Sequence, residues 1–396
     1  MQTKIPAVFM RGGTSRAVCF REDVLAPYPP SVRDRIILAA LGSPDVHGRQ
    51  IDGLGGGISS LSKVVIVGRS PQSDSDVTFT FGQVDVRTPH IDWSGTCGNM
   101  SAAVGPFAID EGIVPAVEPV TTVRVFSTNT GKRYVARVPV CAGQAVVEGE
   151  YMIDGVPAPG ACITLEYPDP GGSLGGELLP TGLPRQQCGL ADSRVVTISV
   201  VDAVIPTVFV RAEELRADAT QLAPALDAES ALQQTLEEIR CRSAILLGLT
   251  PSLEEAHEKF QHTPKVVLVA LPATYLASSG KRVEAESIDL LARAISMRNT
   301  HRTVPGTVAM CTALAAQIEG TVVHEVARQA APHDIRIGHP AGFMEVGATA
   351  SRRGGGWYAE RVTTKRTARR IMEGAVLVPQ KYLDGTVWFG AEKSDA

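Results

Sequence analysis

The residue with the clearest chemical potential is Cys97, in the string Thr96-Cys-Gly-Asn-Met100. The string lies where a strand ends and an alanine-rich run predicts a helix that is apolar on every face. A cysteine at a helix N-terminus meets unpaired N–H groups and the positive end of the helix dipole, which favour its thiolate. We therefore expect Cys97 to act as an acid or a base, beside N–H groups that hold a substrate carboxylate. The alternative is a small buried hydrophobe.

A second candidate is Lys63, which lies in the apolar strand Lys63–Val67. Burial would lower the pKa of this lysine toward neutrality and make it a usable base. The alternative is that Lys63 points to solvent from an edge strand. Lys265 occupies the corresponding place in the similar string Lys265–Val269, and we expect Lys265 to be the exposed one.

Two glycine-rich segments, Arg11–Ser15 and Gly53–Gly57, invite a phosphate-binding interpretation that their spacing excludes. A P-loop needs Gly-Lys-Ser/Thr directly after the loop, and a dinucleotide fingerprint needs a third glycine where Ile58 stands. Their backbone N–H groups can still bind a carboxylate, or the segments are plain turns. Of the eight histidines only His257 and His262 are close, on different faces of a helix, so we expect no metal.

Four sequence matches in the same order indicate a duplicated chain rather than a coincidence of common strand sequences. Their offsets rise slowly from 200 to 212: Ile5–Arg11 with Ile205–Arg211, Lys63–Val67 with Lys265–Val269, Trp93–Gly112 with His301–Gly320, and Val123–Val125 with Ile335–Ile337. We call residues 1–185 the N-terminal half and residues 186–396 the C-terminal half, joined by a linker rich in proline and glycine within 168–184.

Each half predicts an α+β unit with one central helix. Short β-branched runs with turn-rich joins predict a mostly antiparallel sheet. The runs from Ser101 and from Thr307 to Gln317 are apolar all round, so the sheet should wrap around a buried helix. The C-terminal half carries an extra helical block, Glu213–Glu258. The basic run Lys365–Arg370 predicts a solvated face, and the last 40 or so residues are expected to pack back on the N-terminal half.

Composition excludes several classes of partner. A net charge of −4 and only 5% aromatic residues argue against nucleic acid and against anionic membrane surfaces. No apolar run approaches the ~18 residues of a membrane span. Arg11 follows the start too soon for a signal peptide, and seven cysteines without a CxxC pair are typical of reduced thiols. We expect a cytoplasmic protein.

The string Cys97-Gly-Asn at the start of a buried helix, in a duplicated chain, resembles the diaminopimelate-epimerase-like superfamily. The resemblance implies two similar halves with the active site between them and both helix N-termini pointing at the substrate. Members that racemise amino acids use one cysteine from each half. Here the position that matches Cys97 is Pro305, and Cys311 falls inside the helix, which disfavours a two-thiol racemase.

Longer strings resemble the 2-methylaconitate isomerases (PrpF-type proteins) over nearly the whole chain. 4-Oxalomesaconate tautomerases and 3-methylitaconate isomerases share these strings, and Arg16 departs from the lysine expected there. The strings are Met10-Arg-Gly-Gly-Thr-Ser15, Asp52-Gly-Leu-Gly-Gly56, Ser59-Ser60, Ser62-Lys63, Cys97–Phe107, Thr303-Val-Pro-Gly-Thr307, Ile335-Arg-Ile-Gly-His-Pro340, Arg366-Thr-Ala-Arg369 and Glu373-Gly374.

The resemblance implies an isomerase without metal or organic cofactor that shifts a double bond in a small unsaturated di- or tricarboxylate. Its catalytic lysine and cysteine would be Lys63 and Cys97, with Lys63 as the base and Cys97 as the acid or only an orienting group. Fixed cations and N–H groups would hold the carboxylates. The residues expected to bind substrate are Thr14, Ser15, Ser59, Ser60, Asn99, Met100, Arg302, Gly306 and Thr307.

Among such acids we favour 2-methylaconitate, in propionate (2-methylcitrate) catabolism. The alternatives are a 4-oxalomesaconate tautomerase, a 3-methylitaconate isomerase, an amino-acid racemase, and a non-catalytic helper of an aconitase-like hydratase. An oligomer and a functional link to such a hydratase are compatible with the sequence.

Overall fold

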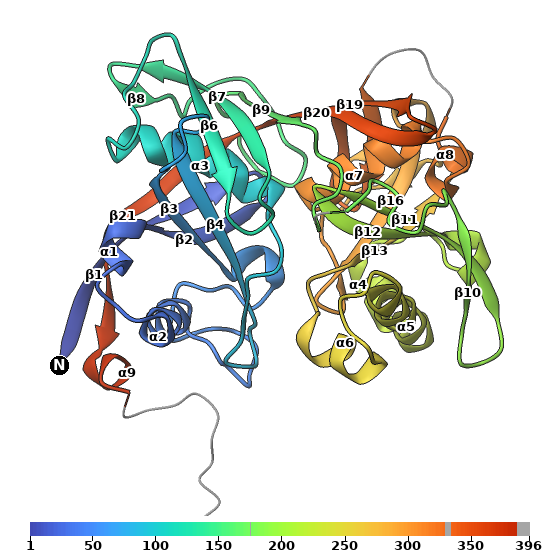
Figure 1. Cartoon of the computed structure of the whole chain (residues 1–396), viewed down its shortest axis with the longest axis horizontal. Coiled ribbons are helices and arrows are strands. Elements are labelled where there is room, and N and C mark those ends of the chain that lie inside the picture. Colours follow the sequence, from blue (N-terminus) through green and yellow to red (C-terminus); the bar gives the residue numbers. More distant parts are fainter. Residues whose placement is uncertain (175, 329–333, 386–396) are drawn as a thin grey trace, which may run out of the picture.

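The computed structural model describes residues 1–174, 176–328 and 334–385. Two halves lie side by side, the N-terminal one in blue to teal and the C-terminal one in green to orange (Figure 1). Their strands form one continuous sheet of 19 strands, with a separate two-stranded sheet of β14 (Tyr275–Leu276) and β15 (Arg282–Val283). In the described ranges no helix is both long enough and apolar enough to cross a membrane.

The N-terminal half is a curved sheet around one helix, α3 (Gly98–Asp110). Its other elements are β1 (Gln2–Gly12), β2 (Ser15–Arg21), α1 (Glu22–Leu25), α2 (Pro30–Leu41), the 3₁₀ turn η1 (Ser59–Leu61), β3 (Lys63–Arg69), β4 (Val77–Val84), β5 (Ile91–Asp92), β6 (Val120–Ser127), β7 (Arg133–Cys141), β8 (Gln144–Ala145) and β9 (Ile163–Pro168).

The C-terminal half repeats this plan around α7 (Gly306–Gln317). Its other elements are β10 (Gln186–Gly189), β11 (Val195–Ala203), β12 (Ile205–Arg211), η2 (Ala212–Leu215), α4 (Ala223–Ala228), α5 (Ser230–Leu246), α6 (Leu253–Lys259), β13 (Lys265–Ala270), η3 (Ala285–Ser287), β16 (Leu290–Ser296), β17 (Asn299–Thr300), α8 (Val322–Val326), β18 (Ile335–His339), β19 (Gly342–Arg353), β20 (Gly356–Arg366), β21 (Ala368–Pro379) and α9 (Gln380–Leu383).

The pairing pattern of the strands confirms the duplication. In the N-terminal half β2 pairs in parallel with β3, β3 pairs antiparallel with β4, and β4 pairs in parallel with β6. The C-terminal half makes the same three pairings with β12, β13, β16 and β18. Three of the four sequence matches therefore join equivalent elements: β3 with β13, α3 with α7, and β6 with β18.

The remaining sequence match, Ile5–Arg11 with Ile205–Arg211, is wrong. It equates β1 with β12, whereas the register places Val18 of β2 opposite Val64 and Val208 of β12 opposite Val266. The true equivalent of β12 is β2. Both β1 and β12 are rich in apolar residues that suit a strand, and such sequences resemble each other without a common position in the fold.

The two central helices are buried as the sequence predicted. Every residue of α3 from Gly98 to Ile109 is buried, and so is every residue of α7 from Gly306 to Ala316. Their small residues let the surrounding strands approach closely, because a Cβ atom on Gly105 would lie 2.7 Å from Cγ2 of Val138. The predicted helical block appears as α4, α5 and α6, and Gly354–Gly355 makes the tight turn between β19 and β20.

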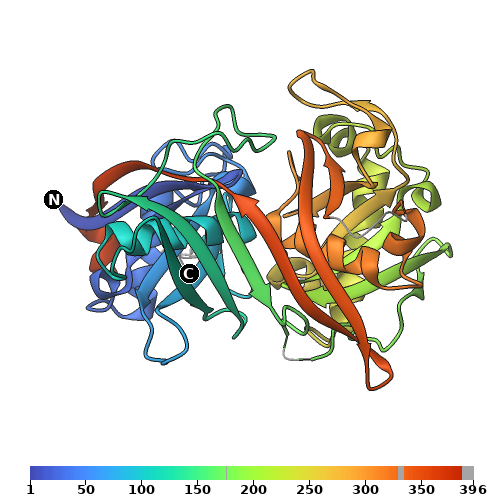
Figure 2. The same cartoon turned by 90° about the horizontal axis from the view of Figure 1, so that it is seen from above.

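The last strands tie the halves together. β20 pairs with β19 on one side and with β9 of the N-terminal half on the other. β21 then runs antiparallel to β1 along almost its full length. Figure 2 shows these orange and red strands extending from the C-terminal half to the N-terminal half. The interface between the halves is thus crossed by continuous backbone, and the site described next lies at this interface.

Candidate active site

The N-termini of the two central helices meet tip to tip. Cys97 is the N-cap residue of α3, and Pro305 is the N-cap residue of α7. A Cβ atom added to Gly98 would lie 2.7 Å from the backbone N of Thr307, and one on Gly306 would lie 3.1 Å from the backbone N of Asn99. Glycine is needed at both positions for this approach. Two positive dipole ends and their free N–H groups therefore face one place, where an anion is stabilised.

Lys63 lies beside this place as a buried base. Its side chain is only 6% exposed, and its Nζ donates to Oε1 of Gln83 at 2.5 Å and lies 5.1 Å from the ring centroid of Phe81. Gln83 is itself fixed because its Nε2 donates to the carbonyl oxygens of Ser59 and Ser62 at 3.1 and 2.9 Å. Burial lowers the pKa of Lys63, while the facing Cys97 thiolate opposes that shift. A lysine in this position can accept a proton.

Cys97 is buried, 8% exposed, and basic side chains surround its thiol. Its charge acts on Lys63, on Lys265 and on Arg366, and in each case a Cys97 thiolate raises the pKa of the basic group. The three basic groups come from β3, β13 and β20, so both halves contribute to the environment of one thiol.

The prediction that Lys265 is exposed is wrong. Lys265 is 2% exposed, and its Nζ lies 2.9 Å from Oγ of Ser296 and 3.0 Å from Nδ1 of His262. The reason is that β13 is paired on both sides, by β12 and by β16, and has no solvent edge. Burial and the nearby charge of Lys63 lower the pKa of Lys265 to about 7. The site therefore holds two lysines at equivalent positions of the duplicated fold.

A chain of hydrogen bonds crosses the interface beside the helix tips. Nδ1 of His301 lies 3.1 Å from both the backbone N and Oγ1 of Thr303, Oγ1 of Thr303 lies 3.0 Å from Oγ1 of Thr14, and Nδ2 of Asn99 donates to Thr14 at 3.0 Å. Burial lowers the pKa of His301 to about 3, so the ring is neutral near pH 7. His301 was not predicted as a site residue, although it is the first residue of the segment His301–Gly320 that matches Trp93–Gly112.

The prediction that Lys365–Arg370 is a solvated face is wrong at Arg366. This side chain is 3% exposed, and its Nε donates to Oδ1 of Asn99 at 3.3 Å. Successive residues of a strand point to opposite faces, so Lys365 is exposed while Arg366 turns toward the helix tips. Burial lowers the pKa of Arg366 to about 10, which leaves the group charged at neutral pH.

Two cavities flank the helix tips. The larger, about 560 Å³, is lined by Ser59, Ser60 and Arg302, which the sequence analysis named, and by Gln83, Ser296 and His301. The smaller, about 250 Å³, is lined by Thr14 and Asn99, also named there, and by Thr303 and Arg366. Lys63 is held by a residue of the larger cavity, and Cys97 lies two residues before a residue of the smaller one. Neither Lys63 nor Cys97 lines either cavity itself.

Four of the predicted binding residues, Ser15, Met100, Gly306 and Thr307, line neither cavity. Ser15 is buried and accepts from Nδ2 of Asn99 at 3.5 Å. Met100 has its side chain in the core, so only its backbone N–H is available to a ligand. Gly306 and Thr307 form the tip of α7. Arg302 is exposed, at the wall of the larger cavity, rather than held beside the lysines.

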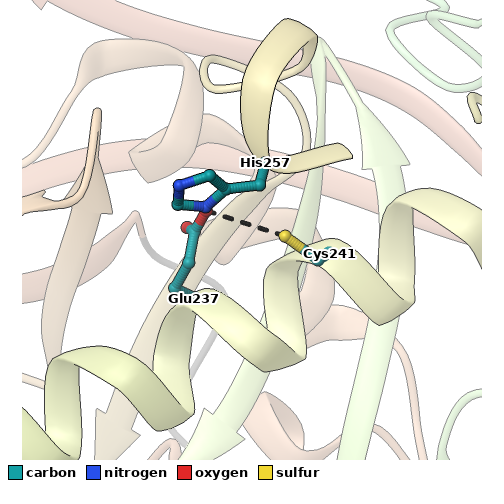
Figure 3. Close-up of side chains that lie close together, drawn as sticks. All are labelled: Glu237, Cys241 and His257. Atoms are coloured by element: carbon teal, nitrogen blue, oxygen red, sulfur yellow. Dashed lines mark hydrogen bonds and ion pairs between the residues drawn. The ribbon is translucent and has the colours of Figure 1, made fainter. Parts of the chain in front are cut away.

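In the described residues one cluster has three side chains of the types that bind metals: Glu237 and Cys241 of α5 and His257 of α6 (Figure 3). Both oxygens of Glu237 accept from Arg240 at 2.7 Å, and Nε2 of His257 lies 3.0 Å from Nη1 of Arg298. Burial raises the pKa of Cys241 to about 11, so the thiol is protonated at neutral pH. Guanidinium groups already occupy the ligand atoms, and the cluster fits an ion-pair network that joins the two helices.

Comparisons with known proteins agree with this geometry. The family model described as "PrpF protein" matches residues 2–379. A protein named 2-methyl-aconitate isomerase from Cupriavidus necator is 41% identical over 388 residues, which cover 96% of this chain and 98% of that protein. A crystal structure of a methylitaconate-delta-isomerase is 38% identical with a TM-score of 0.76, covering 98% of each chain.

A probable proline racemase from Agrobacterium radiobacter has a TM-score of 0.54 at 11% identity, covering 95% of this chain and 93% of that one. This likeness concerns the fold alone, and it confirms the racemase- and epimerase-like architecture of two halves around central helices.

Proposed function

Because the chain belongs to the PrpF family, we propose that it is an isomerase that moves a double bond within a small unsaturated tricarboxylate, with 2-methylaconitate as the favoured substrate. The observation that supports this proposal is that the buried Lys63 responds to the charge of Cys97, which is the N-cap of α3 at the point where the N-termini of α3 and α7 meet. A carboxylate-substituted alkene has an acidic allylic proton, and that point offers a base, an acid and an anion-binding cradle.

Lys63 is the base of the proposed reaction. Its neutral amine takes the allylic proton, so that a C–H bond breaks and an N–H bond forms. The electron pair spreads over the allyl system and the attached carboxylate. Burial supports this role because the apolar surroundings disfavour the ammonium form before the reaction and so keep the amine ready to accept a proton.

Cys97 is the acid that completes the shift. Its S–H proton passes to the other end of the allyl system, where a new C–H bond forms and the double bond moves by one position. The thiolate left on Cys97 faces the ammonium of Lys63, and proton transfer between them restores the starting state. In the reverse direction the two groups exchange roles, as reversible acid–base catalysis requires.

The helix tips hold a carboxylate during this transfer. The free N–H groups of Asn99 and Thr307 converge from α3 and α7, and the dipoles of both helices stabilise negative charge there. Because the donors are fixed by folded backbone, they need no rearrangement when charge develops on the substrate.

A two-thiol racemase mechanism needs a second cysteine at the helix tips, and the described residues place none there. Pro305 stands where the second cysteine would be, and Cys311 is fully buried inside α7 with its Sγ 3.5 Å from the carbonyl oxygen of Val201. Burial raises the pKa of Cys311 to about 12. We therefore keep the isomerase and leave the racemase aside.

The test is to mix the purified protein with 2-methylaconitate, 3-methylitaconate and 4-oxalomesaconate separately and to follow the isomer distribution by proton NMR. We expect conversion of 2-methylaconitate at a rate above that of the other two. A protein that isomerises none of them, yet captures a hydratase, would support the helper function instead.

A further inference from the structure

Arg366 is a buried cation that faces no carboxylate in the described parts of the chain. Its hydrogen bonds go to the amide oxygen of Asn99, to the carbonyl oxygen of Lys365 at 2.8 Å, and to the sulfur of Met344. All three acceptors are neutral. The guanidinium is thus 3% exposed and forms no ion pair with a carboxylate of the described residues, unlike the half-buried Arg370 nearby, which pairs with Glu111 at 2.7 Å.

An uncompensated buried charge is unfavourable by several kcal/mol, and proteins retain one mainly where a ligand or partner neutralises it. Guanidinium keeps its charge at neutral pH and presents parallel N–H groups that match the two oxygens of a carboxylate. The natural partner of Arg366 is therefore a carboxylate from outside the chain.

The smaller cavity gives such a ligand room. Arg366 lines this cavity of about 250 Å³ together with Thr14, Asn99 and Thr303, whose hydroxyl and amide groups are hydrogen-bond donors. The space is comparable to the small end of ligand pockets. His339 also lines it, and burial lowers the pKa of this histidine to about 3, so that it adds no charge.

Two acidic residues line the same cavity and do not neutralise Arg366. Asp154 accepts from the backbone N of Phe343 at 2.8 Å and lies 3.9 Å from Nζ of Lys281. Glu345 is exposed on the strand that carries Met344. Neither forms an ion pair with Arg366 among the described contacts, so the inner end of the cavity stays positive.

Asn99 connects this cation to the helix tips. Its backbone N lies at the meeting point of α3 and α7, while its side-chain oxygen is 3.3 Å from Arg366. A small molecule with one carboxylate at the helix tips can therefore place another carboxylate at Arg366.

We propose that Arg366 is a specificity-determining residue that pairs with a second substrate carboxylate and makes the site select acids with two or more carboxylates over monocarboxylates. This inference rests on the proposed function for the identity of the substrate. It also assigns the smaller cavity, rather than the exposed Arg302, to the recognition of that carboxylate.

The test measures binding of two saturated acids, tricarballylate and the monocarboxylate butyrate, by titration calorimetry. Neither acid has a double bond to move, so binding is separated from turnover. For Arg366→Met we expect the Kd of tricarballylate to rise by about 10–100-fold, the value of a lost charge-assisted hydrogen bond, and the Kd of butyrate to change by less than about 3-fold.

Arg361→Met is the matched control. Arg361 lies on the same strand, is exposed, and is 4.0 Å from Glu166, so its loss should leave both affinities unchanged. If Arg366→Met does not fold, Arg366→Lys is used. It keeps the charge but loses the planar contact, and binding of tricarballylate should still weaken relative to that of butyrate.

The outcomes separate this inference from the proposed function. Equal binding of tricarballylate to wild type and to Arg366→Met, or no binding to wild type, overturns the role of Arg366. A loss of tricarballylate and butyrate binding by the same factor also overturns it, because that is the pattern of a structural residue. If the Arg366 dependence is found but no unsaturated acid is isomerised, the proposed function fails and the anion site stands.

Discussion

The burial of Lys265 predicts how the free energy of unfolding of the protein depends on pH. In the folded chain the pKa of Lys265 is about 7, against about 10.4 for a free lysine. Between these values the unfolded chain binds a proton that the folded chain does not, so the free energy of unfolding rises with pH throughout this window. The stability that the neutral form of Lys265 contributes is complete above about pH 10.4 and is lost as the pH falls toward 7.

The slope in this window is about 1.4 kcal/mol per pH unit for one proton. From pH 7.5 to pH 9.5 the wild type should therefore gain about 2.5 kcal/mol from Lys265. Lys265→Met removes the titrating group, so its free energy of unfolding should rise by that much less over the same interval. The comparison between proteins cancels the titrating groups that do not interact with Lys265.

The assay is urea denaturation of wild type and Lys265→Met at both pH values. Lys4→Met is the control, because Lys4 lies exposed on β1 and its replacement should leave the pH dependence of stability as in the wild type. A Lys265→Met protein whose stability changes with pH as the wild type's does would refute the argument. It would mean that Lys265 is charged in the folded chain at pH 7.5.

Three further changes test other parts of the site. Lys265→Met should move the acid limb of the kcat/KM profile to higher pH, because Lys63 would gain its proton more readily without a second cation nearby; a fixed limb would show that the lysines do not interact. Gly98→Ala should reduce activity by at least about 100-fold, since its Cβ would lie 2.7 Å from the backbone N of Thr307 and force the helix tips apart; wild-type kcat would contradict that close approach. Cys311→Ala should keep activity within about 3-fold in steady-state kinetics, and denaturation should show a loss of stability of roughly 1 kcal/mol, as expected for a small buried side chain. Loss of turnover would instead indicate that Cys311 acts as a second catalytic thiol.

The helix tips were predictable from the sequence because their signals are local. An alanine-rich run without polar residues predicts a buried helix, and the string before it places Cys97 at the N-cap. The same pattern in the second half places Pro305 at the equivalent N-cap. The absence of a second thiol from the site could therefore be predicted without a structure.

The burial of Lys265 and of Arg366 could not be predicted in the same way. Whether a strand lies at the edge or the centre of a sheet depends on its partners, and β13 is flanked by β12 and β16 from distant parts of the sequence. Arg366 lies in a run of charged residues that is typical of a surface, and only the pairing of β20 with β9 turns it inward. Both errors concern long-range contacts.

His301 and the mistaken equivalence of β1 with β12 have a similar origin. A single histidine has no pattern from which its position can be inferred, and the hydrogen bond between Thr14 and Thr303 brings together residues 289 positions apart. Apolar strand sequences are too alike to align a duplicated fold, whereas the pairing of β2 with β3 and of β12 with β13 aligns it directly.

The role of Lys63 is tested most directly by Lys63→Met in deuterated water. The variant removes the base and one hydrogen bond to Gln83 from a buried position, so the protein should remain folded and should still bind tricarballylate. Proton NMR should show loss of isomerisation by at least about 100–10,000-fold, the usual contribution of a general base, and no deuterium entering the allylic carbon of 2-methylaconitate. Isomerisation and deuterium exchange at the wild-type rate would contradict the account.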